Sequence, residues 1–190
     1  MKRAVVVTLA GLALAAAALG AQPARFIVEE DQVLLTYQAA LGRQQLSGVS
    51  RQLHGAVEEL PGGGLRVSAS APVASFQSGS AALDAMLRAA LGADRFPTVE
   101  FEGRAPLGKR AGQFTVELEG TLSLHGVSRP VRVPVRVVRD GKLLFVKAAF
   151  PVDLAGFGLA PPAIAGMRLS PRLQIELHAL LHAAPLSASL

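Results

Sequence analysis

The sequence contains no cysteine and no tryptophan, and only 5% of its 190 residues are aromatic. Without cysteine the chain can form no disulfide, no thiolate metal site and no cysteine nucleophile. The folded state must therefore be held together by burial of its apolar core. With few aromatic side chains, there are also few groups large enough to fill the inside of a closed sheet.

The first 21 residues have the layout of a secretory signal peptide. Lys2 and Arg3 form a basic start, residues 4–19 are uncharged and apolar, and small residues follow at positions 20 and 21. At about 16 residues the apolar segment is short for a membrane-spanning helix, which needs about 20. We therefore expect cleavage between residues 20 and 24 and a periplasmic or secreted protein. The alternative is an uncleaved membrane anchor.

The rest of the chain is long enough for one domain, which we expect to span residues 22–184, with a short tail at residues 185–190. Without Lys2 and Arg3 the chain carries 17 basic and 14 acidic residues, so its net charge is about +3. Arg132 and Arg136 would share one face of a strand, and the valines around them the other, so these charges belong to a solvated outer face. Such a mild, scattered excess does not predict a nucleic-acid partner.

Most of the chain after the signal segment alternates apolar and polar residues, which is typical of strands with one buried and one solvated face. Val99 and Phe101, for example, are separated by Glu100. The same pattern recurs in residues 33–37, 65–71, 114–119, 131–137 and 173–177. Glycine-containing turns at residues 61–64 and 140–141 lie between alternating runs and indicate antiparallel hairpins.

One segment has the helical period instead. Ser80 is a suitable N-cap and Gly92 a suitable stop. Between them lies an apolar stripe formed by Leu83, Met86, Leu87, Ala90 and Leu91. Such a stripe predicts a short helix that flanks or plugs the core. Phe96-Pro97 then favours extended backbone before the next strand.

About eight strands, hairpin connections and one short helix predict an all-β fold: an antiparallel, up-and-down, eight-stranded β-barrel with one short α-helix. Closure removes the exposed edges that so many strands would otherwise present. A barrel of eight strands is either filled by its own side chains or wide enough for one ligand. The slim valine, alanine and leucine side chains expected inside favour an apolar bore.

Alternation also predicts which residues point into that bore. The candidate lining residues are Val99, Phe101, Phe114, Val116, Leu118, Val133, Val135, Leu144, Val146, Phe150, Ile175 and Leu177. Residues 151–167 form the longest irregular stretch and are rich in glycine, proline and alanine. We expect an apolar loop of this length to be a lid or portal, with Phe157 as the portal residue, or else simply to cover the end of the barrel.

No group of residues predicts a catalytic or metal site. His178 and His182 are four residues apart, but no third ligand accompanies them. His125 precedes Gly126 at an expected strand junction, where a role in the turn is the simpler explanation. The sequence has no Gly-x-Ser-x-Gly motif, and its paired glutamates lie on expected outer faces or strand ends. We therefore expect no catalytic residues, no metal and no enzymatic activity.

Three motifs together resemble the YceI-like family of secreted, lipocalin-like bacterial barrels. They are the helix followed by Phe96-Pro97 and Phe101, Gly120-x-Leu122-x-Leu124-His125-Gly126-Val127-x-Arg129-Pro130-Val131, and Phe150-x-Val152-Asp153-x-x-x-Phe157-Gly158. Two segments depart from the family pattern: residues 23–26, where a polar opening is usual, and residues 168–172, where an acidic turn is common. Both departures concern the contacts expected with the head group of a ligand.

The resemblance implies an exported lipid-binding protein. It would hold a long apolar chain (a polyisoprenoid, a quinone or a fatty-acid derivative) inside the barrel, for carriage, storage or stress protection in the cell envelope. A bound isoprenoid or quinone would be a ligand, and no cofactor is implied. Transient contact with a membrane surface and formation of a homodimer are both compatible with this function. The alternatives are a filled barrel that serves as an envelope stress or interaction module, and a hydrolase or isomerase that uses His125.

Overall fold

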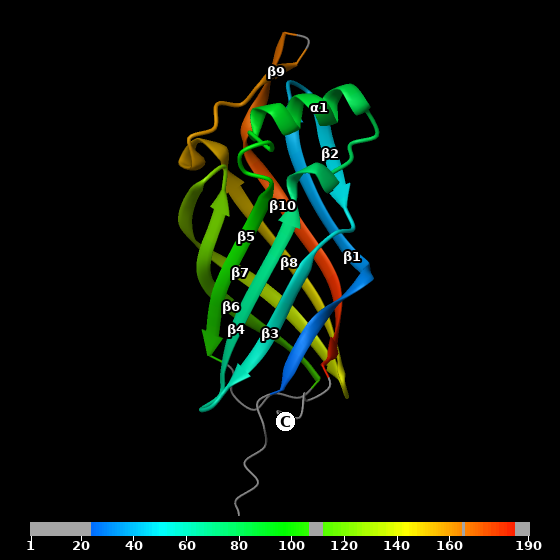
Figure 1. The fold of residues 1–190 in the computed structure, drawn as a ribbon, viewed down its shortest axis with the longest axis vertical. Coiled ribbons are helices and arrows are strands. Elements are labelled where there is room, and N and C mark those ends of the chain that lie inside the picture. The colour runs from blue at the N-terminus through cyan, green and yellow to red at the C-terminus, as the bar shows by residue number, and fades with distance from the viewer. Residues whose placement is uncertain (1–23, 107–111, 165, 185–190) are drawn as a thin grey trace, which may run out of the picture.

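The computed structural model describes residues 24–106, 112–164 and 166–184, which form a β-barrel with a helix across one end (Figure 1). The expected signal peptide (residues 1–21) and tail (residues 185–190) lie outside the described residues. The described strands are β1 (Arg25–Leu41), β2 (Gln44–Ser50), β3 (His54–Leu60), β4 (Gly64–Pro72), β5 (Thr98–Pro106), β6 (Gly112–Leu124), β7 (Val127–Asp140), β8 (Leu143–Asp153), β9 (Ala163–Ile164) and β10 (Met167–Ala183). The helical elements are η1 (Val73–Ser75), α1 (Ala81–Ala90) and η2 (Leu154–Phe157).

Eight of these strands form a closed antiparallel barrel, in the order β1-β3-β4-β5-β6-β7-β8-β10. The barrel closes because β1 also pairs with β10, from Phe26 opposite Ala183 to Leu41 opposite Leu169. A register shift after Val28 bends β1 on its way around the barrel. The predicted eight-stranded barrel with one short helix is confirmed.

The wall is incomplete at the end that carries α1. The first residues of β1, Arg25–Ile27, pair with β3, whereas Leu35–Leu41 pair with β2. β3 pairs with β4 and so continues the sheet. The outer edge of β2 pairs with no further strand in the described part of the chain and forms one isolated β-bridge, between Val49 and Gln77. The segment that carries η1 and α1 covers this interruption, and Figure 1 shows α1 lying above β2.

Two predicted hairpins and one turn residue are where the sequence placed them. Leu60 pairs with Gly64 across the first turn, and β7 and β8 are joined through Gly141, whose φ is 56°. His125 and Gly126 link β6 to β7 with φ values of 53° and 72°. Positive φ at both positions is the signature of a type I′ turn, which matches the twist of the flanking strands. His125 is therefore a turn residue.

The helix begins and ends as predicted. The Ser80 side chain accepts a hydrogen bond from the Leu83 N–H, and Gly92 follows the helix with a φ of 60°. Leu87 and Leu91 face the inside of the barrel, in agreement with the predicted stripe. Leu83 and Met86, also in that stripe, are not among the residues that line the cavity, and 41% of Met86 is exposed.

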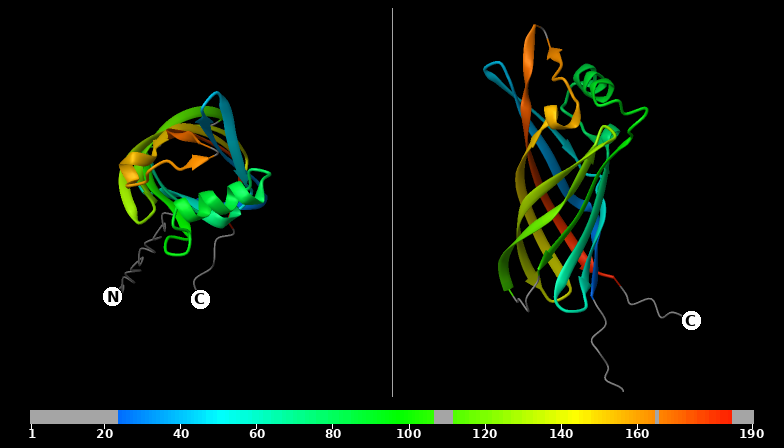
Figure 2. Two further views of the ribbon diagram at one scale, coloured as in Figure 1. Left: turned by 90° about the horizontal axis from the view of Figure 1, so that it is seen from above. Right: turned by 90° about the vertical axis from the view of Figure 1, so that its left-hand side faces the viewer.

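The segment from 151 to 167 is more regular than predicted. Residues 151–153 continue β8, η2 follows, and β9 pairs with the start of β10. Seen from above, the part of the segment that contains β9 crosses the mouth of the barrel, with α1 along the opposite side (Figure 2). This segment and α1 together cover the same end of the barrel.

Alternation of the strands decides which side chains form the core. On β7, Val133, Val135 and Val137 are buried, whereas Arg132 and Arg136 are exposed. The arginines are thus the outer face of a half-buried strand, as predicted. The buried valines belong to the main apolar cluster, which lies inside the barrel.

Candidate binding site inside the barrel

The packing inside the barrel leaves a cavity of about 280 Å³. On β10 its lining residues extend from Leu169 to Leu181. That is a path of roughly 40 Å along the strand and, at the usual tilt of barrel strands, roughly 30 Å along the barrel axis. The cavity is therefore long and narrow, a shape that suits an extended chain better than a compact ligand.

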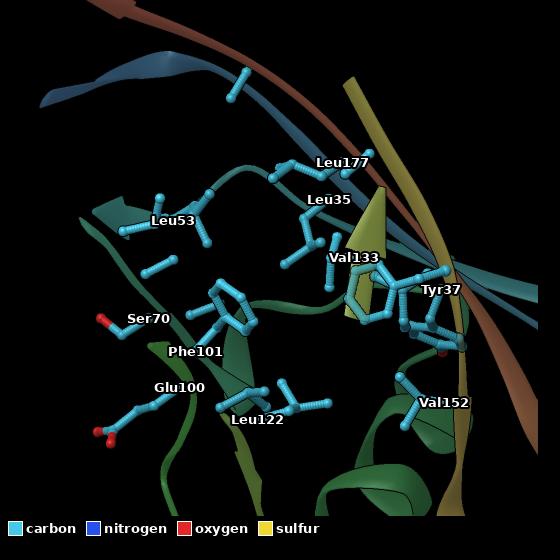
Figure 3. A pocket seen from close by; sticks show the side chains of 18 of the residues that line it. Leu35, Tyr37, Leu53, Ser70, Glu100, Phe101, Leu122, Val133, Val152 and Leu177 are labelled. Atoms are coloured by element: carbon cyan, nitrogen blue, oxygen red, sulfur yellow. The ribbon is translucent and has the colours of Figure 1, made fainter. Parts of the chain in front are cut away.

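The wall of the cavity is almost entirely apolar. Leu35, Val133 and Leu177, from β1, β7 and β10, lie around one common space (Figure 3). The charged residues of the lining are Glu59, Asp84, Arg88, Glu100 and Arg139. The Glu100 side chain is exposed and points away from this space (Figure 3). Such a lining favours a hydrocarbon ligand that is oriented by a few polar groups.

The structure places all but one of the predicted lining residues on the cavity. Those that line it are Val99, Phe101, Phe114, Val116, Leu118, Val133, Val135, Leu144, Val146, Phe150, Ile175 and Leu177. Phe157, expected at a portal, is elsewhere: it is 4% exposed and packs with neighbours that include Leu122 and Leu154. The cause is η2, which Asp153 caps and Gly158 ends in the left-handed conformation, so that Phe157 packs against the wall.

Most of the residues that line the cavity were not predicted. The most consequential belong to β1: Phe26, Leu35 and Tyr37. The alternation of residues 33–37 carries the same signal as the other strands, so Leu35 and Tyr37 could have been predicted from it. Asp84 and Arg88 were not predicted because charged residues beside the apolar stripe of a helix usually face solvent.

Glycines let the aromatic rings of the lining lie flat against the wall. A Cβ atom on Gly103 would lie 2.6 Å from Phe101 Cζ, and one on Gly120 would lie 2.8 Å from it. A Cβ atom on Gly48 would lie 2.6 Å from the hydroxyl oxygen of Tyr37. Because these glycines have no side chain, the rings occupy the space along the wall instead of the space along the axis. The bore stays open as a result.

At the end away from α1, an ion pair crosses the bore. Arg139 Nη1 lies 2.8 Å from Glu59 Oε1, although β7 and β3 are not neighbours in the sheet. The guanidinium also lies 5.3 Å from the ring centre of Phe26, which is 1% exposed. Since both charged side chains remain partly exposed, the pair stabilises the fold by about 1 kcal/mol at most. The polar groups at this end therefore have partners within the protein.

At the α1 end, Tyr37 has a buried hydroxyl group with no hydrogen-bond partner among the described residues. Its ring packs against Phe76 with 5.9 Å between ring centres. Burial, and secondarily the negative charge of Asp84, raises the pKa of Tyr37 to about 12. A buried hydroxyl without a partner costs about 1–3 kcal/mol.

Asp84 is held in place by Ser78. One carboxylate oxygen of Asp84 accepts hydrogen bonds from the Ser78 hydroxyl at 2.6 Å and from the Ser78 N–H at 2.8 Å. These bonds, the hydroxyl's above all, lower the pKa of Asp84 below its ordinary value. Asp84 and Arg88, one helical turn apart, thus bring one negative and one positive charge to the α1 end of the cavity.

The histidines belong to no group of metal-ligating side chains in the described part of the chain. His178 and His182 lie four residues apart on β10, a distance of about 13 Å on a strand, which is too far for one zinc ion. Within residues 24–106, 112–164 and 166–184, no three His, Cys, Asp or Glu side chains could hold a metal ion together. His125 packs edge-on against Phe96 with 5.0 Å between ring centres. In the same ranges, no helix is long and apolar enough to cross a membrane.

Known proteins of the same fold and sequence pattern were found. The family model of the YceI-like domain matches residues 28–181. A UPF0312 protein of Azotobacter vinelandii is 31% identical over 145 residues, which cover 71% of this chain and 74% of that protein.

Two solved structures share the fold. BcnA of Burkholderia cenocepacia superposes with a TM-score of 0.69 at 18% identity, covering 80% of this chain and 98% of that one. A polyisoprenoid binding domain of Saccharophagus degradans also gives a TM-score of 0.69, at 14% identity, covering 84% of this chain and 98% of that domain. With the closed barrel and the extent of the family match, the chain belongs to the YceI-like domain family.

Proposed function

We propose that this protein is an exported lipid-binding protein that holds one long apolar chain inside its barrel, for carriage, storage or stress protection in the cell envelope. The observation that carries the proposal is the long, almost entirely apolar cavity. The ligand classes that fit are a polyisoprenoid, a quinone or a fatty-acid derivative. The Saccharophagus relative, described as a polyisoprenoid binding domain, supports this choice. Export to the periplasm or medium is proposed from residues 1–21.

The energetics favour a carrier over a permanent store. Transfer of a hydrocarbon chain from water into the cavity is favourable by about 0.8 kcal/mol per buried CH₂ group. A membrane offers the same chain nearly the same gain. The net preference of a lipid for the protein therefore depends on the shape of the bore and on polar contacts at its end. Such a small difference suits a protein that takes up lipid and releases it again.

We place the passage for the ligand at the α1 end. In the described part of the chain the wall there lacks paired strands between β2 and β4 apart from the Val49–Gln77 bridge, and α1 and the segment that contains β9 cover this end of the barrel. The opposite end has an ion pair across the bore. A lipid would enter between α1 and the β1–β2 hairpin, during transient contact of this end with a membrane surface.

We propose binding in preference to catalysis because the described residues that line the cavity include no histidine, lysine or cysteine. His125 belongs to a turn and packs on Phe96. The hydroxyls of Ser123 and Ser128 lie 2.8 Å apart and bond to each other. A barrel filled by its own side chains is disfavoured by the cavity itself.

Native mass spectrometry of protein exported by a bacterial host tests the proposal. We expect one bound isoprenoid, quinone or acyl species per chain, released by organic solvent. Val116→Trp places a large ring in the bore and should abolish binding. Val138→Trp is the matched control, since Val138 is 37% exposed on the outside of β7. Ligand-free protein that also refuses added quinones and fatty acids would contradict the proposal.

A further inference from the structure

The outside of the barrel carries a row of apolar side chains on β7, β8 and β10, which are neighbours in the wall. Val138 on β7 pairs with Phe145 on β8, and Phe145 pairs with Leu180 on β10. Val138 is 37% exposed and Phe145 46% exposed, and Leu180 is half-buried. We call these three residues the outer apolar row. The residues that alternate with them face the cavity instead: Val137, Leu144 and Leu181.

The rows two residues to either side extend this apolar surface onto β1. On the side toward α1, Leu34 of β1 is 36% exposed and lies in the same row as Arg136 of β7. On the other side, the half-buried Ile27 of β1 and Leu143 of β8 lie in the same row as Asp140 of β7. Six apolar side chains thus form one surface across four neighbouring strands.

This surface differs from the rest of the outer wall. A corresponding outer row across β3, β4, β5, β6 and β7 consists only of charged residues: Glu58, Arg66, Arg104, Glu119 and Arg132. Single exposed apolar residues are common, but a contiguous group spread over roughly 14 Å across the strands and 13 Å along them is typical of an interaction site. The alternation of the strands therefore does not account for this surface, and a covering partner does.

The charges beside the outer apolar row indicate what covers it. Arg136 lies two residues before Val138 on β7, and Asp140 lies two residues after it. Both are exposed, and neither has an ion-pair partner within the described ranges. A positive charge on one side of the row and a negative charge on the other do not suit an anionic membrane. They do suit a surface that meets its own copy in the opposite direction.

A two-fold axis along the outer apolar row makes this surface complementary to itself. Rotation about that axis places Val138, Phe145 and Leu180 against the same residues of a second copy. The residues two positions before and after Val138 then exchange places, so that Arg136 meets Asp140 of the second copy, twice over. By the same rotation Leu34 of β1 meets Ile27 of the second copy.

We propose that two copies of this chain form a dimer through this surface, with the strands of the two copies antiparallel. The proposal goes beyond the proposed function and does not depend on it, because the side chains concerned point away from the cavity. A face of four strands is at the small end of specific interfaces, so we expect a reversible dimer with a dissociation constant on the order of micromolar.

Sedimentation velocity over a concentration series of the exported protein tests the dimer. Phe145→Asp should raise the dissociation constant of the dimer about a hundredfold, because it places a charge at the centre of the interface. Val49→Asp is the matched control, since Val49 is 39% exposed on β2, away from this surface. A wild type that stays monomeric up to millimolar concentration would overturn the inference. So would a dimer that Val49→Asp disrupts and Phe145→Asp does not, since its copies would join at the edge of β2.

Charge reversal tests the direction in which the copies meet. Arg136→Asp should weaken the dimer about tenfold, because it places like charges opposite each other. The double variant Arg136→Asp/Asp140→Arg should restore the dimer. Within one chain these residues are about 13 Å apart along β7, so the restoration can come only from contact between copies. A double variant as weak as Arg136→Asp would overturn the antiparallel arrangement.

Two further measurements separate the alternatives. Phe145→Asp should keep the unfolding temperature of the wild type and its affinity for a fluorescent apolar dye, measured by displacement of the dye from the bore. A loss of dye binding by the wild type would contradict the proposed function but not the dimer. Flotation with vesicles of phosphatidylcholine and phosphatidylglycerol tests a membrane as the partner. Monomeric wild type that floats with these vesicles, and fails to do so after Phe145→Asp, would overturn the inference in favour of a membrane contact.

Discussion

The two ends of the barrel are built differently. Away from α1, Phe26 is 1% exposed, and Arg139 lies over its ring while pairing with Glu59. At the α1 end the sheet is interrupted between β2 and β4, and the buried Tyr37 hydroxyl has no partner within the described ranges. At one end the two charged side chains across the bore are paired with each other, whereas at the other end the sheet is interrupted and the Tyr37 hydroxyl has no partner in the described part of the chain. We infer that the first end stabilises the fold and that the second exchanges ligand.

Truncation of a large side chain at each end gives the largest expected contrast. Phe26→Ala should lower the free energy of unfolding by about 3–5 kcal/mol, because it removes a nearly fully buried ring and enlarges the empty space inside the barrel. Leu87→Ala on α1 should cost only about 1 kcal/mol, because that side chain is half-buried against a cover that can adjust. Urea unfolding of the two variants measures both values. Similar losses at the two ends would contradict the assignment of stability to the end away from α1.

The wall between the two ends predicts a smaller effect. A methyl group on Gly120 would clash with the Glu102 carbonyl oxygen and lie 2.7 Å from Gly103 Cα, so Gly120→Ala should cost about 1–3 kcal/mol. The methyl group of Gly103→Ala would contact mainly the Phe101 ring, which can move toward the barrel axis. This variant should therefore lose less stability than Gly120→Ala but bind ligand more weakly.

Gly64→Ala is the control for both glycine variants. Gly64 is also in a strand, and the nearest atom to an added Cβ is 3.6 Å away. Urea unfolding and dye displacement should show little change in this variant. Normal ligand binding by Gly103→Ala would show that the flat ring does not set the width of the bore.

The ion pair at the end away from α1 should make a modest contribution. A double-mutant cycle with Arg139→Gln and Glu59→Gln should give a coupling free energy of about 1 kcal/mol or less, reduced by added salt. The exposed pair of Arg132 and Glu119, at 3.3 Å, is the matched control and should show a smaller coupling. Equal coupling free energies for the two pairs would mean that the position of the Arg139–Glu59 pair across the bore does not strengthen it.

The smallest expected effect is a pH dependence at the α1 end. In the folded protein Tyr37 should ionise near pH 12, against 10.0 for an ordinary tyrosine, as an absorbance titration of this single tyrosine will show. Because the folded state holds the proton more tightly, the associated stability is complete below pH 10 and falls as the pH rises toward 12. Tyr37→Phe should lack this component. Ionisation of the folded protein near pH 10 would contradict the described burial.

Local patterns predicted much of the fold. Alternation identified Val133 and Val135 as inward and Arg132 as outward, because side chains on a strand alternate without exception over short distances. The cap at Ser80 and the turn at His125 were also visible, since both depend on neighbouring residues alone. The same local logic placed twelve residues on the wall of the cavity.

Features that join distant parts of the chain were not predictable. The contact of Glu59 with Arg139 spans 80 residues, and nothing in either segment indicates it. Tyr37 and Asp84 come together only because α1 lies above β2. Phe157 was expected at a portal from its apolar loop, but the short η2 turn, invisible to periodicity, buries it.

The aromatic rings of Tyr37 and Phe101, which lie over Gly48 and Gly103, have an evolutionary consequence. At Gly48 and Gly103 the atoms nearest an added Cβ belong to an aromatic side chain. Any glycine codon becomes an alanine or valine codon by a single base change. One mutation at either position would therefore move a ring toward the axis and narrow the passage, while the hydrogen bonds between strands stay in place. Under the proposed function, barrels of this fold can diverge in the ligands they accept through such single steps, without first evolving a new fold.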